Sequence, residues 1–383
     1  MDWAKIVFYG SALTLFYVYV GYPLLLFLIA ALQKPRKAEP GYTPSISILI
    51  AACNEEAGIK RKLEQTLSQD YPADKMEILV LSDGSEDRTD EIVSQCTDRR
   101  VRLVRIPERR GKTNAQNEGV KHAKGEVLIF SDATTIYHEQ ALKYLASNYQ
   151  DARVGAVSGR YQYFDPGQDS PTGMGTIAFW SYENKIKEWQ SRIGTLTGCC
   201  GCIYSVRKSA YTELAPDVIS DLVQPLWVIQ NGHRVVFEDR ALAYEQTTES
   251  ATEEFAMRVR VITRGIRGLL SVPELLKPWK HPWIAFQLFS HKILRWMVSV
   301  FLLLLLIGNF KLMDRPFFRV VLIAQLCFYA VALLQLLVPL HRRWKPLGIP
   351  LYFCTLNLAA FVGVIELLRG RKHVVWQPVR HKG

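Results

Sequence analysis

Residues 45–56 read Ser-Ile-Ser-Ile-Leu-Ile-Ala-Ala-Cys-Asn-Glu-Glu, and this stretch decides the fold. Its first part, residues 45–52, is apolar and β-branched, as in a strand that is buried on both faces. An amide and two carboxylates follow almost at once, so polar groups stand where the strand ends. This order is typical of a parallel α/β sheet, in which ligands bind outside the carboxyl ends of the strands.

Strand and helix patterns alternate along the segment that follows. Periodicity predicts helices at 59–69, 87–96 and 112–123, and strands at 76–81, 101–106 and 126–130. This alternation indicates a parallel sheet with helices on both faces. Another strand is expected to begin at Ala156. Residues 177–193 are expected to form a helix that lies either at a membrane interface or in an ordinary core.

Polar residues follow each of the four predicted strands. They are Asn54 and Glu55, Asp83-Gly84-Ser85, Arg109-Arg110-Gly111-Lys112, and Ser131-Asp132-Ala133-Thr134. One such cluster alone could be a turn or a helix cap. Four in series at the carboxyl ends predict a binding site along one rim of the sheet.

This polar block lies between apolar stretches. Residues 8–32 carry no charged side chain and are long enough to cross a hydrocarbon core of about 30 Å. Further apolar segments occupy 283–310, 317–340 and 347–368. We therefore expect an N-terminal transmembrane anchor (1–33), a linker (34–44), a cytoplasmic domain (45–250), interfacial amphipathic helices (251–282), two to three transmembrane helices (283–370) and a basic tail (371–383).

The side of the membrane follows from the basic residues. Lys34, Arg36 and Lys37 come directly after the first apolar segment, which places the polar block in the cytoplasm by the positive-inside rule. The C-terminal topology stays open, because His291, Lys292 and Arg295 interrupt the first of the three later segments. Counting that segment as a span puts the basic tail outside; omitting it puts Arg342, Arg343 and Lys345 outside.

The composition argues against two other classes. The net charge of +11 is attributed to membrane flanks and not to nucleic acid, since no basic helix or aromatic RNA platform is present. The seven cysteines are an odd number, and most lie in the predicted cytoplasmic block, where disulfides are rare. Cys199, Cys200 and Cys202 have no second cluster at zinc-finger spacing, so metal binding by these thiols is not expected.

As a set, these residues resemble membrane-bound family 2 glycosyltransferases, which are inverting enzymes of the GT-A fold. The resemblance is carried by Tyr19 to Pro23, Ala52 to Glu56, Leu81 to Ser85, Gly111-Lys112, Phe130 to Ala133, Thr197-Gly198 with Gly201 and Arg207, and Ile219-Ser220-Asp221. It implies a GT-A (Rossmann-like) nucleotide-sugar-binding domain inserted between transmembrane α-helices, at the cytoplasmic face of a multi-pass inner membrane protein.

The resemblance also implies roles for the rim residues. Asn54, Glu55 and Asp83 would bind the base and ribose of the donor, and Lys112 would lie beside its phosphates. Asp132 takes the place of the first acid of the family's D-x-D motif and would bind Mg²⁺ or Mn²⁺, which prefer hard oxygen ligands. Thr134 stands where the second acid is expected, so the metal site departs from the pattern.

Asp221 matches the family's catalytic base, which removes a proton from the acceptor hydroxyl. The alternative from the residues alone is a helix cap, because Asp221-Leu-Val-Gln224 has the form of a capping box. Thr197, Gly198, Arg260 and Arg264 would serve the acceptor or the diphosphate. For the two arginines the alternative is contact with lipid phosphate headgroups.

The function that this resemblance implies is transfer of a sugar, expected from a UDP-sugar, to a lipid-linked glycan acceptor. A processive polysaccharide synthase is one alternative. Such synthases carry Gln-x-x-Arg-Trp, whereas residues 261–265 here read Val-Ile-Thr-Arg-Gly. A membrane sensor or scaffold that binds a nucleotide sugar without turnover is another. Membrane lipids and polysaccharide export proteins are the further expected partners.

Overall fold

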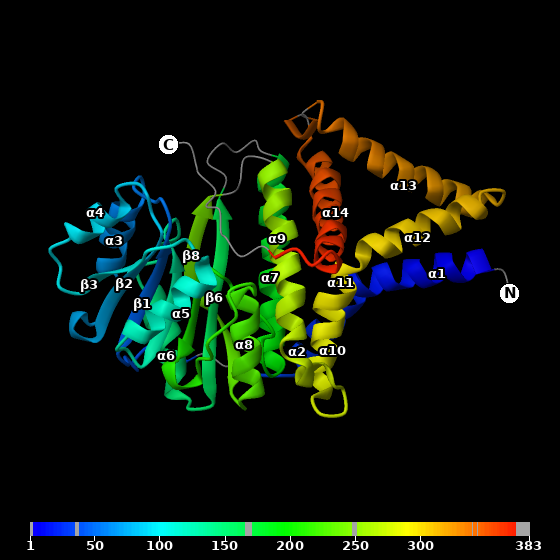
Figure 1. Cartoon of the computed structure of the whole chain (residues 1–383). Helices are drawn as coiled ribbons and strands as arrows, with labels where there is room; N and C mark the ends of the chain where they lie inside the picture. The colour runs from blue at the N-terminus through cyan, green and yellow to red at the C-terminus, as the bar shows by residue number, and fades with distance from the viewer. Residues whose placement is uncertain are drawn as a thin grey trace.

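The structure is a computed structural model that describes residues 3–34, 38–164, 171–246, 251–338, 340–342 and 344–372. An eight-stranded sheet with the order β3-β2-β1-β4-β7-β6-β8-β5 forms the centre of the polar block (Figure 1). The strands are β1 (Ile46–Ala52), β2 (Met76–Asp83), β3 (Val101–Ile106), β4 (Val127–Asp132), β5 (Ile136–Tyr137), β6 (Val154–Phe164), β7 (Ile203–Arg207) and β8 (Arg234–Gln246).

The sheet has two halves of different character. Strands β1 to β4 are parallel, as predicted, and their carboxyl ends share one edge. Beyond β4 the sheet continues with β7, which runs antiparallel to both β4 and β6. β8 is parallel to β6, and the short β5 pairs antiparallel with β8. The predicted parallel sheet is therefore correct for the first half only, and the α/β fold class is confirmed.

Helices cover both faces of the sheet because successive residues of the strands point to opposite sides. Ile48 and Ile50 of β1 pack beneath α3 (Ile59–Leu67), α4 (Thr89–Ser94) and α6 (Ala141–Ser147). Leu49 packs on the other face, with α5 (Lys112–His122) and α8 (Ser220–Gln230). Every residue of β1 is buried, and all of them except Ser47 are apolar.

Two long helices, α7 (Pro171–Ile193) and α9 (Ala251–Leu270), join the sheet to the apolar helices (Figure 1). Trp180 of α7 packs on the sheet side, and Ile186 packs with Tyr22 of the N-terminal helices. The core interpretation of residues 177–193 is thus favoured over the interfacial one. α9 packs against α8 on one side and against α14 on the other.

The apolar helices begin with α1 (Trp3–Phe16), η1 (Tyr17–Gly21) and α2 (Tyr22–Ala31), which run without a break. The later ones are α10 (Pro282–Leu288), η6 (Phe289–Ile293), α11 (Leu294–Trp296), α12 (Val298–Lys311), α13 (Pro316–Leu334) and α14 (Gly348–Leu368). The short 3₁₀ segments are η2 (Ala73–Lys75), η3 (Asn148–Gln150), η4 (Lys208–Ala210), η5 (Pro273–Leu276), η7 (Leu340–Arg342) and η8 (Lys345–Leu347).

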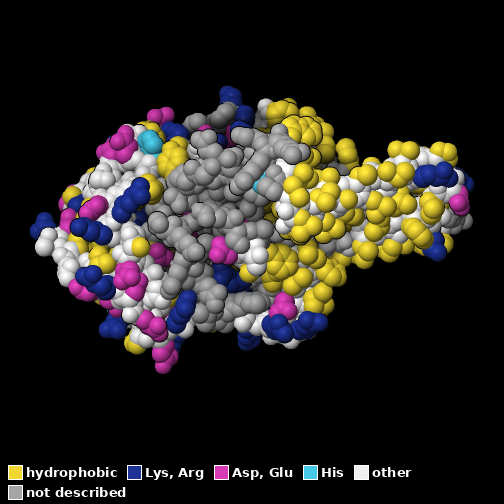
Figure 2. Space-filling model, turned by 90° about the horizontal axis from the view of Figure 1, so that it is seen from above, with side chains coloured by type: hydrophobic (Ala, Val, Ile, Leu, Met, Phe, Trp, Pro, Cys, Tyr) yellow, Lys and Arg dark blue, Asp and Glu magenta, His cyan; other side chains and the backbone are white. Residues whose placement is uncertain are grey.

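Three helices of the described residues are long and apolar enough to cross a membrane: Trp3–Ala31, Pro316–Leu334 and Gly348–Leu368. A fourth candidate is the pair Pro282–Trp296 and Val298–Lys311, which is bent by 59°. The bend falls directly after the charged residues that made the sequence ambiguous. The helices α1, α12 and α13 form an arm that projects from the polar domain (Figure 1). In Figure 2 hydrophobic side chains cover this arm.

Several of the basic residues from which the membrane topology was predicted lie outside the described part of the chain. Arg36, Lys37 and Arg343 are not described, and nothing is described of the side chains of Arg342 and Lys345. The basic tail is described only at Arg371 and Lys372. The predicted side of the membrane and the domain boundaries therefore stay predictions.

Candidate active site

The rim begins at Asn54, which links the loops after β1 and β2. Its backbone adopts a left-handed conformation with a φ of 57°, which Asn tolerates better than most residues. The Asn54 Oδ1 accepts a hydrogen bond from the Glu86 N–H at 2.8 Å, and the Asn54 N–H donates to Ser85 Oγ at 3.1 Å. These loops border an open hollow of about 740 Å³ that extends to Arg109.

Asp83 is buried at the end of β2 and holds the neighbouring loop. Its two carboxylate oxygens accept hydrogen bonds from the backbone N–H groups of Arg110 and Gly111, each at 2.8 Å. Gly84, with a φ of 63°, allows the close approach, because a Cβ there would lie 2.8 Å from the Arg109 nitrogen. Asp83 thus holds the loop that leads to Lys112. The contact predicted between Asp83 and the donor would be an additional interaction of the same carboxylate.

Glu55 is half-buried beside other carboxylates on the rim. Burial, together with the charges of Asp132, Asp87 and Glu245, raises the pKa of Glu55 to about 7. An acid in this position changes its charge near neutral pH. Glu55 therefore gives the rim a negative charge that depends on pH near neutrality.

Lys112, Asp132, Asp221, Arg260 and Arg264 are brought together around a cavity of about 190 Å³. Lys112 forms an ion pair with Asp132, and its Nζ donates to the Gly201 carbonyl at 3.3 Å. Burial alone would lower the pKa of Lys112, but the charge of Asp132 raises it overall, so this side chain stays cationic. Five charged residues from distant parts of the sequence thus line a cavity at the carboxyl ends of the parallel strands.

Asp221 is the second residue of α8, and the capping-box interpretation is wrong. The N-cap is Ile219, and no side chain caps the helix. The Oδ1 atom of Asp221 is buried without a hydrogen-bond partner among the described residues. Burial raises the pKa of this carboxyl, although Lys112, Lys187 and Lys292 oppose the shift. A buried, unsatisfied carboxylate with a raised pKa is suited to accept a proton.

Arg264 extends from α9 into the polar domain. Its Nη2 donates to Thr113 Oγ1 at 2.9 Å and to the Val218 carbonyl at 2.5 Å, and the residue is only 6% exposed. This burial contradicts the headgroup-contact alternative for Arg264. Burial, with the charge of Arg260, lowers the pKa of Arg264 to about 10. Arg260 lines the same cavity but forms none of these contacts.

A second, more apolar chamber of about 430 Å³ adjoins the first. It lies between α7, α9, the α10–α11 segment and α14, and Asp221 and Trp180 border both cavities. Its wall also carries the charged residues Glu183, Lys187, Arg258, Lys292 and Arg295. Glu183 is ion-paired with Arg295. The chamber therefore connects the proposed base to the apolar helices.

The predicted acceptor residues Thr197 and Gly198 differ in their placement. Gly198 lines the apolar chamber, and a Cβ there would lie 3.8 Å from Lys292 Nζ. Thr197 is fully buried and lines neither cavity. At the position of the absent family tryptophan, Gly265 faces Trp296 of α11, whose ring would lie 3.4 Å from an added Cβ.

Sequence reasoning missed Glu245, Tyr161 and Lys292 near the site. Glu245 stands near the carboxyl end of β8, directly after the apolar run Ala241–Tyr244, which is the one sequence signal of a strand there. Lys292 was interpreted only as a residue that interrupts an apolar segment. Tyr161 carries no sequence signal, because its place depends on the antiparallel half of the sheet.

The residues present fit a Mg²⁺ or Mn²⁺ ion bound with a nucleotide. Within the described chain no group of three or more His, Cys, Asp or Glu side chains forms a metal cage. These ions are commonly held by one or two carboxylates together with substrate phosphates and water. Asp132 offers such an oxygen ligand beside the cationic Lys112.

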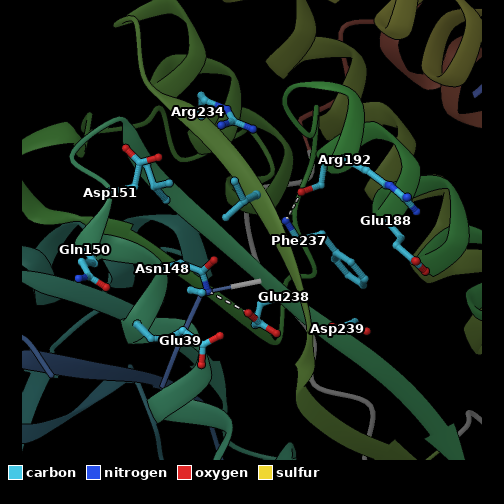
Figure 3. A pocket seen from close by; sticks show the side chains of 15 residues that line it. Glu39, Asn148, Gln150, Asp151, Glu188, Arg192, Arg234, Phe237, Glu238 and Asp239 are labelled. Carbon is cyan, nitrogen blue, oxygen red and sulfur yellow. Dashed lines mark hydrogen bonds between the residues drawn. The ribbon is translucent and has the colours of Figure 1, made fainter. Parts of the chain in front are cut away.

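A separate hollow of about 570 Å³ lies at the opposite edge of the sheet (Figure 3). It is bordered by the starts of β6 and β8 and by α7. Several of its polar groups already have partners: Asn148 donates to Glu238 at 3.1 Å, and Arg192 donates to the Gln33 carbonyl at 2.7 Å. None of the rim residues borders it, so it is not part of the candidate active site.

Comparison with known proteins agrees with this geometry. Residues 47–215 match the family described as glycosyl transferase family 2. The chain is 30% identical over 241 residues to the poly-β-1,6-N-acetyl-D-glucosamine synthase of Staphylococcus epidermidis, an alignment that covers 61% of this chain and 58% of that protein. It is 29% identical over 232 residues to the synthase of Staphylococcus aureus (strain COL), covering 59% and 55%. The chain thus spans under two thirds of these relatives' length.

A solved structure resembles nearly the whole chain. It is the mannosyltransferase PcManGT from Pyrobaculum calidifontis in complex with GDP-Man and Mn²⁺, with a TM-score of 0.72, 21% identity, and coverage of 95% of this chain and 99% of that one. This likeness confirms the GT-A-like fold flanked by apolar helices. The fold is therefore that of the GT-A-like glycosyltransferases, and the domain at residues 47–215 is one of glycosyl transferase family 2. The resemblance drawn from the sequence and the expected enzyme class are both confirmed.

Proposed function

We propose that this protein transfers a sugar, with inversion, from a nucleotide-sugar donor to a lipid-linked glycan acceptor. One observation carries the proposal: Asp221 borders both the charged cavity at the sheet edge and the apolar chamber between the helices. A base in this position faces a donor on one side and an amphiphilic acceptor on the other. A UDP-sugar is the donor to test first.

On the donor side, Asn54, Glu55 and Asp83 surround the place for the base and ribose. Lys112, Arg260 and Arg264 would neutralise the diphosphate, whose negative charge grows as the bond to the sugar breaks. A bound Mg²⁺ or Mn²⁺ would supply further charge stabilisation to this leaving group. PcManGT is in complex with Mn²⁺, which supports a divalent metal in this protein as well. Asp132 would bind that ion.

On the acceptor side, Asp221 would take the proton of the acceptor hydroxyl as its oxygen attacks the anomeric carbon. The hydrocarbon part of the acceptor would enter the chamber along Phe179, Ile262 and Leu356, which are part of its apolar lining. The site would then operate at the membrane surface. We place it at the cytoplasmic face of the inner membrane, where nucleotide sugars are made. The positive-inside rule assigns the basic residues after the first span to the same side.

The poly-β-1,6-N-acetyl-D-glucosamine synthases among the relatives favour a second candidate, a processive synthase of an exported polysaccharide. The largely apolar lining of the chamber argues for an amphiphile instead of a long glycan. Gly265 also stands where processive synthases carry the tryptophan of their Gln-x-x-Arg-Trp motif. Export proteins would be partners of either product.

The experiment is to incubate membranes containing the protein with radiolabelled nucleotide sugars and to separate products by solvent extraction and size. Single transfer predicts label in a lipid-extractable product that carries one added sugar at saturating donor. A high-molecular-weight polymer would establish the processive candidate. Label in neither fraction with any donor, while the donor still binds, would favour a sensor or scaffold.

A further inference from the structure

The D-x-D motif lacks its second acid in this sequence, but in the folded chain another carboxylate, that of Glu245, lies at the same place. Thr134 occupies the position of that acid, two residues after Asp132. Its Oγ1 donates a hydrogen bond to Oε1 of Glu245 at 2.9 Å. The side chain that stands in place of the acid therefore holds a carboxylate that comes from another strand.

The fold brings Glu245 there through strand pairing. Ile136 of β5 pairs with Tyr244 of β8, so Glu245 lies beside the segment that follows Asp132. The hydroxyl of Tyr161, on the neighbouring β6, donates a second hydrogen bond to Oε2 of Glu245. Both carboxylate oxygens thus accept hydrogen bonds, one from the turn between β4 and β5 and one from β6.

Glu245 forms no ion pair with any residue of the described part of the chain. Its hydrogen-bond donors among the described residues are two neutral hydroxyls, and Asp132 is the strongest of the neighbouring charges that act on it. Lys112 is paired with Asp132, and Lys62 directs its Nζ to the Thr135 carbonyl at 2.7 Å. Glu245 is half-buried, and withdrawing a carboxylate from water without a paired cation is costly unless a positive charge binds there.

We propose that Glu245 supplies the second carboxylate of the divalent-cation site, together with Asp132, and that Thr134 and Tyr161 position it. This inference rests on the proposed function, since the ion would bind with the diphosphate of a nucleotide. Two carboxylates plus phosphate oxygens and water make a ligand set that Mg²⁺ and Mn²⁺ accept. The second acid of the metal site would then be present in this protein, but at Glu245 and not at position 134.

The test is a titration of the detergent-purified full-length protein with Mn²⁺ in the presence of saturating UDP or GDP, with free Mn²⁺ read by electron paramagnetic resonance. Removing a metal-ligating oxygen should cost at least as much as removing an outer-shell partner, so Glu245→Gln should bind Mn²⁺ about tenfold or more weakly. Thr134→Val should weaken binding by a smaller factor. Glu108→Gln, an exposed carboxylate paired with Arg110 on the same rim, is the matched control and should bind normally.

A relocated acid also predicts a rescue. In the Glu245→Gln background, Thr134→Asp restores a carboxylate at the usual position of the motif and should recover most of the Mn²⁺ affinity. Melting temperatures without metal should stay close to the wild-type value, which separates lost binding from lost folding. A Glu245→Gln variant that folds and binds Mn²⁺ like wild type would overturn the inference.

Failure of the proposed function would look different. Wild-type protein that binds UDP or GDP but takes up no Mn²⁺ with either nucleotide would overturn the inference while leaving the donor site intact. Protein that binds neither nucleotide, with or without Mn²⁺, would contradict the proposed function and this inference together.

Discussion

At the scale of single residues, Gly201 determines how close the proposed base comes to the backbone. A Cβ at this position would lie 2.5 Å from Oδ2 of Asp221, a distance that real side chains do not adopt. Gly201 is not one of the described glycines with a positive φ, so its backbone conformation suits an alanine. The obstacle to an alanine there is the Asp221 carboxylate. Gly201 is therefore a position where a methyl group acts directly on the catalytic geometry.

Gly201→Ala should lower kcat by about 10- to 100-fold, because a displaced base loses its alignment with the acceptor hydroxyl. Donor affinity should change little, since the groups proposed to bind the base and ribose lie elsewhere on the rim. Gly194→Ala is the matched control, because nothing lies within 4 Å of a Cβ there. Steady-state transfer rates and donor titrations of both variants test this; equal kcat values would remove the steric argument.

Glu55 gives a pH prediction. Its pKa is raised to about 7, so the carboxyl loses its charge as the pH falls from 8 to 6. If the ionised form accepts hydrogen bonds from the donor, the donor Kd should increase over this range by up to about tenfold. The Kd of the Glu55→Gln variant should be flat. Binding of the active nucleotide sugar, followed by calorimetry, measures it, with the exposed Glu56→Gln as control; a flat wild-type profile would contradict the role of Glu55.

At the scale of elements, the first half of the domain was predictable because the buried parallel strands β1, β2 and β4 are largely apolar runs. The predicted strand at 101–106 matches β3, and β1, β2 and β4 differ by one or two residues at their ends. The second half was not predictable in the same way. β5 has only two residues, and Glu238, Asp239 and Arg240 interrupt the pattern of β8, so the antiparallel strands carry weak signals.

The same limit applies to the candidate site. Residues that follow the parallel strands, such as Asp132, were identified because topology alone places them on one rim. Glu245 could not be assigned, since its proximity to Thr134 depends on the pairing of β5 with β8. The apolar chamber also lay beyond the sequence, because it forms between helices whose packing no periodicity predicts.

Packing of α9 against α8 is tight at Gly268 and gives a prediction about stability. A Cβ there would lie 2.1 Å from Cγ2 of Val223, so Gly268→Ala forces the two helices apart. Overpacking of this kind costs about 1–3 kcal/mol. The melting temperature in detergent should therefore drop by a few degrees, whereas Gly41→Ala, with nothing within 4 Å of its Cβ, should leave it unchanged. An unchanged value for Gly268→Ala would contradict this packing.

At the scale of the whole molecule, the polar domain and the apolar arm are separate regions joined by α7 and α9 (Figures 1 and 2). Within the arm α1 packs along α12, where Gly308 brings the helices close: a Cβ at Gly308 would lie 3.1 Å from Cβ of Phe8. Small residues at helix crossings are common in membranes, because the backbones then approach closely. The exposed apolar side chains of the arm are suited to contact lipid.

Cys327, exposed on α13, tests the membrane placement of the arm. In a variant with Cys96→Ser and Cys354→Ser, the remaining cysteines apart from Cys327 are buried. In open membrane fragments a lipid-soluble maleimide should label Cys327, and a charged one should not. Replacing Cys327 by Ser and the exposed Glu56 by Cys gives a control that both reagents label. Rapid labelling of Cys327 by the charged reagent would place α13 in water.

The most direct test of the account is nucleoside diphosphate release by the detergent-purified protein. The assay uses a panel of nucleotide sugars with Mg²⁺ or Mn²⁺ and a total lipid extract, and it compares wild type with Asp221→Asn. We predict release with a particular donor, dependent on the lipid extract, that falls by a factor of about 100 or more in the variant, as loss of a general base allows. Full release by Asp221→Asn with that same donor would contradict the assignment of Asp221 as the base and the mechanism built on it.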